Sequence, residues 1–162
     1  MRFQLLDRIL EVQAGKLIKA EKFLTLGEEY LADHFPGFPV MPGVLMLESL
    51  LEAGAWLLRV TDGFRNSMTV VREIKNVNYR AFMQPGRKML ITVEYQGLEG
   101  GLAVLKGRGE ADGNPTVSAR LGLASYRLGD SSGSPQVKDE RLCEHWRQLY
   151  EVLRGEKARN RC

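Results

Sequence analysis

The chain has few residues of the kinds that form disulfide bonds or bind transition metals. Only two cysteines and two histidines occur among its 162 residues, and the cysteines, Cys143 and Cys162, both lie in the last twenty positions. Neither has a partner at a spacing typical of a zinc site, and two thiols near one end do not make a disulfide framework. We therefore expect chemistry that needs no metal and no redox cofactor.

Long hydrophobic runs and a strong charge of one sign are also missing. The longest apolar run, residues 44–58, is interrupted by Glu48 and other polar residues, whereas a transmembrane helix needs about 20 mostly apolar residues. The first ten residues contain Asp7 and Arg8 and no small-residue cleavage site, which is not typical of a secretory signal. A net charge of +3 is too small for a general nucleic-acid-binding protein. These absences predict a cytoplasmic location.

Residues 44–58 predict a buried helix of roughly four turns. Pro42 stands just before the run, where a missing N–H costs nothing, and Arg59 follows it at the negative end of the helix dipole. Apolar residues occupy nearly every direction around this helix, so no wide polar face is left for water. Other parts of the structure are therefore expected to cover it.

Segments rich in β-branched and aromatic residues flank the helix. They occupy residues 5–12 and 17–26 before it, and 68–79, 89–96, 102–110 and 116–127 after it. Gly100-Gly101 and Asp112-Gly113 are typical of tight hairpins, so the later strands are expected to pair antiparallel. Nucleotide-binding glycine motifs are absent, and long helices do not alternate with strands. We predict an α+β fold in which an antiparallel sheet of about six strands wraps one long buried helix.

The composition changes near residue 129. Residues 129–136 read GDSSGSPQ, which is typical of a flexible linker. Beyond them four apolar residues recur at spacings of three and four among charges: Leu142, Trp146, Leu149 and Leu153. This pattern predicts an amphipathic C-terminal helix whose apolar stripe docks on the chain's own core, on a neighbouring subunit or on a partner protein. Of these, we expect docking on the chain's own core. We therefore divide the chain into a domain of residues 1–128, a linker of 129–138 and a helical tail of 139–162.

His34 precedes a segment with an unusual number of prolines and glycines. Residues 36–43 contain three prolines and two glycines. Prolines fix φ and glycines permit a close approach of the backbone to a ligand, so we expect a rigid loop that holds His34 just before the buried helix. A loop histidine by itself is more often a surface residue than a catalytic one, so His34 needs a chemical partner.

Glu48 is expected about one and a half turns into the apolar helix, where a carboxylate is costly unless it is paired or protonated. A salt bridge to an arginine would give it a purely structural role. Burial raises the pKa of a carboxyl group, and Glu52 one turn later adds a like charge, so Glu48 is a candidate proton donor near neutral pH. A histidine base beside a carboxylic acid fits the 1,2-elimination of water. The free N–H of Gly43 at the helix start is placed to stabilise an enolate-like oxygen.

The segment that joins these residues, HFPGFPVMPGVLMLE at 34–48, closely resembles the signature of the FabZ-type 3-hydroxyacyl-[acyl-carrier-protein] dehydratases. Residues 5–16 and 77–86 resemble that family's first strand and a later RFRRPVxPGD stretch, so the likeness covers most of residues 3–127. The resemblance implies a hot-dog fold, a homodimer or dimer-based hexamer, and acyl carrier protein as the partner that carries the substrate. It also implies the dehydration of 3-hydroxyacyl thioesters to trans-2-enoyl thioesters in fatty acid or related lipid synthesis, without a cofactor.

The resemblance assigns roles to individual residues. His34 matches the family's catalytic histidine and Glu48 its catalytic glutamate, and the family takes these two residues from different subunits. Gly43 matches the helix-start amide that holds the thioester carbonyl. We assign three further residues to substrate binding: Phe35, Gly37 and Phe82.

Departures from the family pattern keep other functions open. Glu52 stands where the family usually has glutamine, and Arg87 stands where the aspartate of PGD is usual. One alternative is a hot-dog acyl thioesterase, because the same fold supports both chemistries. The other is a non-catalytic acyl-thioester-binding or structural homologue, in which Glu52 has abolished the proton donor.

Overall fold

The computed structural model describes residues 4–129 and 136–155. Two strands, β1 (Arg8–Gln13) and β2 (Leu17–Phe23), precede the short 3-10 helix η1 (Glu29–Leu31) and the long helix α1 (Gly43–Thr61). Four strands and a final helix follow: β3 (Met68–Tyr79), β4 (Lys88–Glu99), β5 (Leu102–Ala111), β6 (Asn114–Tyr126) and α3 (Gln136–Arg154). No helix in the described ranges is long and apolar enough to cross a membrane.

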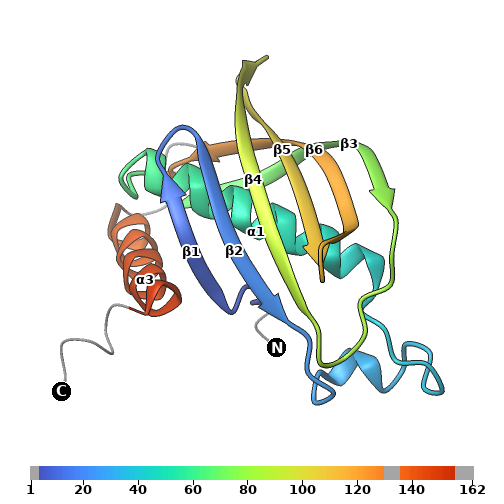
Figure 1. Cartoon of the computed structure of the whole chain (residues 1–162). Coiled ribbons are helices and arrows are strands. Elements are labelled where there is room, and N and C mark those ends of the chain that lie inside the picture. The colour runs from blue at the N-terminus through green and yellow to red at the C-terminus, as the bar shows by residue number, and fades with distance from the viewer. Residues whose placement is uncertain (1–3, 130–135, 156–162) are drawn as a thin grey trace.

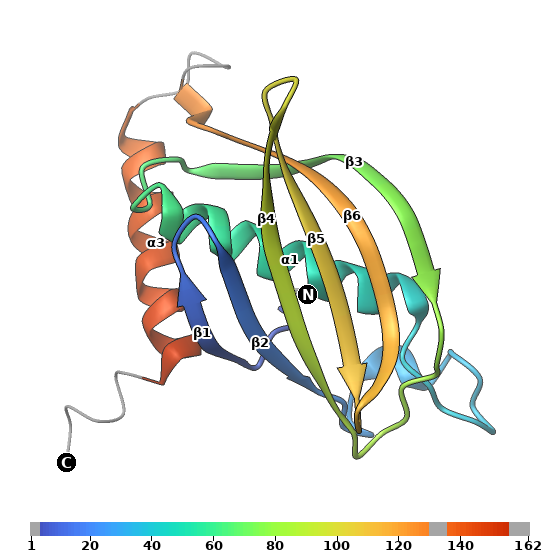
Figure 2. The same ribbon diagram turned by 45° about the horizontal axis from the view of Figure 1, so that its top comes forward.

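The six strands form one antiparallel sheet in the order β1-β2-β4-β5-β6-β3. The sheet curves around α1, which crosses its concave face (Figures 1 and 2). The hairpins that join β4 to β5 and β5 to β6 turn at Gly100-Gly101 and Asp112-Gly113, all with positive φ, as tight turns of this kind require. The predicted α+β fold of six strands around one helix is confirmed.

Helix α1 lies very close to the sheet along one stripe. Leu50, Ala53 and Leu57 on this stripe are all 0% exposed. A Cβ atom at Gly54 would come within 2.8 Å of Cδ1 of Leu105 on β5, so only glycine allows this approach of helix to sheet. The contact fixes the position of α1, and with it the positions of the polar side chains on its other faces.

The opposite face of α1 is only partly covered. Near its amino-terminal end Val44 is 66% exposed, and Glu48 is exposed as well. The sheet covers one face, and α3 packs near the carboxyl-terminal end of α1, where the rings of Trp56 and Trp146 meet at 5.9 Å. The described residues of a single chain therefore cover α1 on the sheet side and near its carboxyl-terminal end, and they leave part of its amino-terminal half open.

Helix α3 docks on the core of its own chain, as its apolar stripe predicted. Leu153 is 4% exposed, and the indole N–H of Trp146 donates a hydrogen bond of 3.0 Å to the carbonyl of Ser67. The helix begins at Gln136, three residues before the boundary expected at 139. Most of the expected linker, residues 130–135, lies outside the described residues, as does the end of the tail, residues 156–162.

Asp139 ties the start of α3 to the end of β6. The side chain of Asp139 is only 2% exposed. Its carboxylate accepts one hydrogen bond of 2.8 Å from the backbone N–H of Leu128 and another of 2.8 Å from that of Gly129. The hydroxyl of Ser67 donates a third hydrogen bond to it. The Ser67 hydrogen bond is the main reason that the pKa of Asp139 lies below its ordinary value of 3.8. A buried carboxylate with three donors holds α3 firmly against the core.

Asp139→Ala is expected to release α3 and to lower the melting temperature, because it leaves these donors without an acceptor. In the unmodified protein, Asp139 contributes its full stabilisation at pH values above 3.8, its ordinary pKa in the unfolded chain. This stabilisation is lost as the pH falls through the lowered pKa of Asp139 in the folded state. Tryptophan fluorescence, which reports Trp146, measures the release during an acid titration. An exposed neighbour on the same helix, Glu140, provides the control variant Glu140→Ala. Equal melting temperatures for the two variants would contradict the assignment.

Candidate active site

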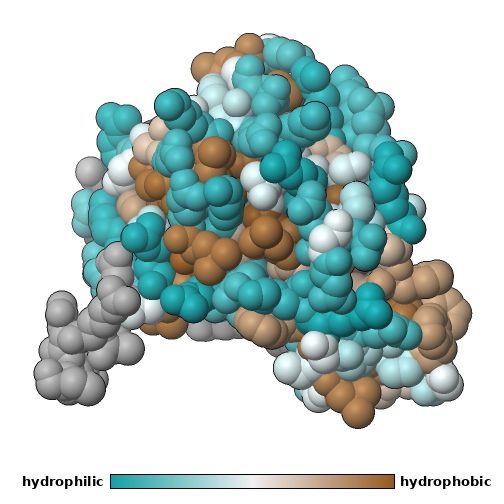
Figure 3. Space-filling model, in the orientation of Figure 1, coloured by the Kyte–Doolittle hydropathy of each residue, from teal (hydrophilic) through white to brown (hydrophobic). Residues whose placement is uncertain are grey.

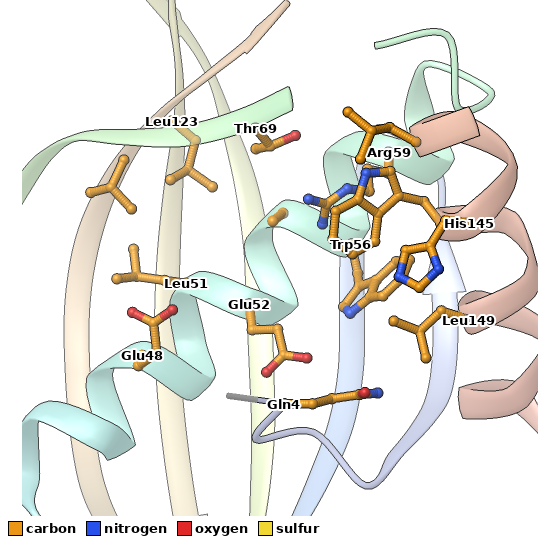
Figure 4. A pocket seen from close by; sticks show the side chains of 14 residues that line it. Gln4, Glu48, Leu51, Glu52, Trp56, Arg59, Thr69, Leu123, His145 and Leu149 are labelled. Carbon is orange, nitrogen blue, oxygen red and sulfur yellow. The ribbon is translucent and has the colours of Figure 1, made fainter. Parts of the chain in front are cut away.

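Most of the residues singled out by the sequence line two cavities, one at the start of α1 and one along its later turns. One cavity, of about 530 Å³, includes His34, Phe35, Gly43 and Phe82. The other, of about 630 Å³, includes Glu48 and lies between α1, β3 and α3 (Figure 4). The structure thus groups four of the six predicted site residues in one cavity and places Glu48 in another. Gly37 lines neither of them.

His34 is held by hydrogen bonds at its backbone and its ring. Its N–H donates to the carbonyl of Tyr30 at 3.1 Å, and its Nδ1 lies 2.8 Å from the carbonyl oxygen of Val40. A carbonyl only accepts, so Nδ1 carries the ring proton, and Nε2 keeps a free lone pair. The proline-rich loop therefore holds the imidazole in an orientation that leaves Nε2 able to accept a proton.

Aromatic side chains surround His34 and face outward. Phe35 contacts the imidazole edge-to-face at 4.5 Å and has a positive φ of 54°, which is rare outside glycine. Phe38 and Phe82 meet at 6.0 Å, and the three phenylalanines are each between 49% and 66% exposed. Apolar colour gathers on this part of the surface, at the lower right of Figure 3. Backbone strain and exposed rings beside a histidine are typical of a functional site that another molecule covers.

Gly43 is the first residue of α1, where backbone N–H groups have no acceptor within the helix. A Cβ atom at this position would lie 3.1 Å from Cδ1 and Cε1 of Tyr79 at the end of β3. The packing of Tyr79 thus favours glycine here, and the cavity wall at Gly43 is bare backbone. An oxyanion in this cavity would meet the positive end of the helix dipole.

Glu48 is exposed in the single chain, contrary to the expected burial inside an apolar helix. The reason is the uncovered face of α1 described above. Its surroundings still remove part of its water, and this partial burial raises the pKa of Glu48 above 4.5. The carboxyl group faces the cavity below Leu51 and points away from Glu52 (Figure 4). Glu48 therefore has the accessibility and the direction of pKa shift that a proton donor needs.

Glu52 has a structural partner that the sequence did not reveal. Its Oε2 accepts hydrogen bonds from the N–H groups of Leu5, at 2.8 Å, and Leu6, at 3.3 Å. The expected effect of Glu52 on Glu48 is not the cause of the raised Glu48 pKa, which comes from burial. The pKa of Glu52 is itself raised, mainly by burial and in small part by Glu48, against the lowering effect of the two amides. Glu52 thus fastens the amino-terminal segment to α1.

Glu52→Gln is expected to raise the melting temperature at neutral pH. Glutamine keeps an oxygen that accepts the two amide hydrogen bonds and removes a charge that burial disfavours. Because the pKa of Glu52 is raised, the folded state binds the proton of this carboxyl group more tightly than the unfolded state does. The destabilisation caused by the buried charge is therefore absent below pH 4.5, the ordinary pKa, and complete above the raised pKa of the folded state. Thermal melts across this pH range should show the gain over the unmodified protein disappear in acid. A lower melting temperature at neutral pH would contradict this.

Sequence reasoning missed the residues at the far end of the second cavity. Arg59 was interpreted as a helix-ending residue, yet it is 8% exposed, and its guanidinium lies 4.1 Å from the centre of the Trp146 ring. The only signal was its position seven residues after Glu52, which places both on one helix face. In the described part of the chain, no group of three or more histidine, cysteine, aspartate or glutamate side chains is arranged to hold a metal ion.

Comparisons with known proteins identify the family of the chain. A model of the FabA-like domain matches residues 1–120. The 3-hydroxyacyl-[acyl-carrier-protein] dehydratase FabZ of Oenococcus oeni is 35% identical over 117 residues, 72% of this chain and 84% of that protein. The enzyme of the same name from Bacillus subtilis is 34% identical over 122 residues, 75% of this chain and 86% of its own length.

A solved structure, the dehydratase heterocomplex ApeI:P from Xenorhabdus doucetiae, superimposes with a TM-score of 0.57 and 21% identity, covering 70% of this chain and 92% of that chain. This likeness concerns the fold alone. The family match covers α1, the His34 loop and all of the sheet except the end of β6, and it ends before α3. The chain therefore belongs to the FabA-like family, and within it to the FabZ type with a hot-dog fold.

Proposed function

We propose that this protein dehydrates 3-hydroxyacyl thioesters, carried by acyl carrier protein, to trans-2-enoyl thioesters in cytoplasmic fatty acid biosynthesis. The observation that carries the proposal is the hydrogen bond between Nδ1 of His34 and the carbonyl of Val40, because it leaves Nε2 as a base in an apolar cavity beside a helix start. The relatives named above act on the same class of substrate, according to their names.

The reaction follows from three groups. Nε2 of His34 removes a proton from C2 of the substrate, and the N–H of Gly43 stabilises the negative charge that develops on the thioester oxygen. The electron pair then forms the double bond between C2 and C3. The bond from C3 to the hydroxyl oxygen breaks, and the carboxyl group of Glu48 donates the proton that lets this oxygen leave as water. The proton taken up by His34 returns to Glu48 before the next cycle.

We infer that each site combines His34 of one chain with Glu48 of another. In one chain the two residues line different cavities, which fits a site that a second chain completes. The sheet ends at β3, which pairs only with β6 among the described strands and exposes Val71 and Ile74 by 42% and 39%. A second copy at this edge would extend the sheet and cover the exposed face of α1. A homodimer, or a hexamer built from such dimers, follows from this proposal.

The role found for Glu52 favours an enzyme over a non-catalytic homologue. The alternative function assumed that Glu52 abolishes the proton donor through its charge. Its carboxylate is instead occupied by the amides of Leu5 and Leu6 and points away from Glu48. The departure from the family's usual glutamine therefore leaves the chemistry of Glu48 intact.

One assay with the full chain separates the three functions. The protein is incubated with a 3-hydroxyacyl carrier protein, while enoyl-thioester absorbance and free thiol are followed together. Dehydration is expected to raise the absorbance without releasing thiol. Release of thiol without enoyl product would instead identify a thioesterase, and neither signal would identify a binding or structural protein.

A further inference from the structure

The cavity that contains Glu48 continues far beyond the proposed reaction centre. It follows one face of α1 from Glu48 past Glu52 and Trp56 to Arg59. Eleven residues of helix separate its two ends, which corresponds to about 16 Å along the axis. An acyl chain whose 3-hydroxyl lies at Glu48 therefore has a path along α1 toward Arg59.

Helix α3 closes the far end of this path. Leu142, Trp146 and Leu149 of α3 line the cavity. Figure 4 shows Leu149 on the side of the cavity formed by α3. These residues lie outside the region matched by the FabA-like model, which ends at residue 120. The far wall is therefore built from a segment outside the matched domain.

Arg59 is a buried cation at this closed end. Its side chain stacks against the rings of Trp146 and Trp56, and its Nε is buried without a hydrogen-bond partner among the described residues. In the same part of the chain no carboxylate forms an ion pair with it, although Glu52 and Asp62 act on it from a distance. Burial lowers the pKa of Arg59 to about 10, so the guanidinium stays charged at neutral pH.

Stacking on the two indole rings offsets only part of the cost of burying this charge. Ring faces attract a cation, but they do not accept the directed N–H hydrogen bonds that a guanidinium makes with oxygen atoms. Figure 4 places the guanidinium on the cavity side of α1, near Thr69, while the Glu52 carboxylate points away toward Gln4. Among the described residues, no acceptor on the cavity wall forms a hydrogen bond with Nε of Arg59.

We propose that the α3 end of this cavity is a subsite for the distal end of the acyl chain, and that Arg59 there binds a terminal carboxylate. The preferred substrates are then 3-hydroxyacyl thioesters with a carboxylate at the end remote from the thioester. The inference rests on the proposed dehydration and adds the class of acyl chain to it. A carboxylate is the group that a guanidinium binds best, through two parallel hydrogen bonds.

The test compares 3-hydroxyacyl carrier proteins in matched pairs, one member ending in a methyl group and the other in a carboxylate, over a series of increasing chain length. For the unmodified full-length protein, kcat/KM is expected to favour the carboxylate by at least about tenfold once the chain is long enough to reach Arg59. Arg59→Met is expected to abolish this preference, and Arg59→Lys to weaken it, because lysine lacks the planar fork. Arg141→Met, at an exposed arginine of α3, should retain it.

The possible results separate this inference from the proposed function. Turnover of methyl-ended substrates with no carboxylate preference at any length would overturn the inference alone. Absence of turnover with every substrate would overturn the proposed function and the inference with it. A preference that persists in a folded Arg59→Met variant would overturn the role of Arg59. Because the comparison between substrates is made first on the unmodified protein, the inference is tested even if a variant does not fold.

Discussion

Replacing His34 with alanine is expected to lower kcat/KM for dehydration by about 10²- to 10⁴-fold, the usual contribution of a general base. The imidazole is the group whose Nε2 is left free by the hydrogen bond to Val40, and no other described residue in the same cavity offers an uncharged nitrogen base. His34 is only half-buried in a surface loop, so its loss should change the melting temperature little. Steady-state kinetics and a thermal melt measure the two effects.

Asp33→Ala is the matched control for His34→Ala. Asp33 is the exposed neighbour of His34 in the same loop, so this change tests whether disturbance of the loop alone lowers the rate. The control is expected to keep nearly full activity. A loss of less than tenfold in His34→Ala, with its fold intact, would remove His34 from the role of base.

Glu48→Gln is expected to cause a loss of similar size, about 10²- to 10⁴-fold, because glutamine keeps the shape of the side chain but has no acidic proton. In the unmodified protein the rate should fall as the pH rises through the pKa of Glu48, since only the protonated acid donates. Partial burial raises that pKa above 4.5, which moves this alkaline limb upward. Coverage of Glu48 by a second chain would move it further in the same direction.

The control for Glu48→Gln is the same substitution one turn later. Glu52→Gln also removes a carboxyl group from α1, but Glu52 holds the amides of Leu5 and Leu6 and points away from the reaction centre. It should keep most of the activity and nearly the same pH profile. Similar losses in the two variants would mean that the net charge of α1, and not the proton of Glu48, governs the rate.

The fold was predictable from the sequence because its periodic patterns are strong. Paired glycines and an aspartate-glycine pair placed the hairpins, and residues 44–58 lie inside the helix found at Gly43–Thr61. The stripe that docks α3 was visible in the spacing of Trp146 and its apolar neighbours. Patterns of this kind depend on residues that are close in sequence, so the elements that they indicate can be predicted without knowledge of the tertiary contacts.

The candidate site was predictable only in part. The His34 loop was evident from its prolines and glycines, but the hydrogen bond that selects the ring tautomer joins residues six apart in an irregular loop. Glu48 and Glu52 look alike in sequence, one turn apart in one helix. Contacts with Leu5 and Leu6, more than forty residues away, make one of them structural and leave the other free. The apolar pattern of α1 predicted that the helix is covered, but a pattern does not distinguish a face that is buried within one chain from a face that a second chain would cover.

Subunit exchange between two inactive variants tests most directly whether His34 and Glu48 form one dehydrating site across two chains. In a dimer of one His34→Ala chain and one Glu48→Gln chain, one of the two sites has both catalytic groups intact. After complete mixing half of the dimers are of this kind, so about a quarter of the original activity should return. Exchange is verified independently with differently tagged chains. No recovery despite verified exchange would contradict a site shared between subunits and, with it, the arrangement of base and acid proposed for this protein.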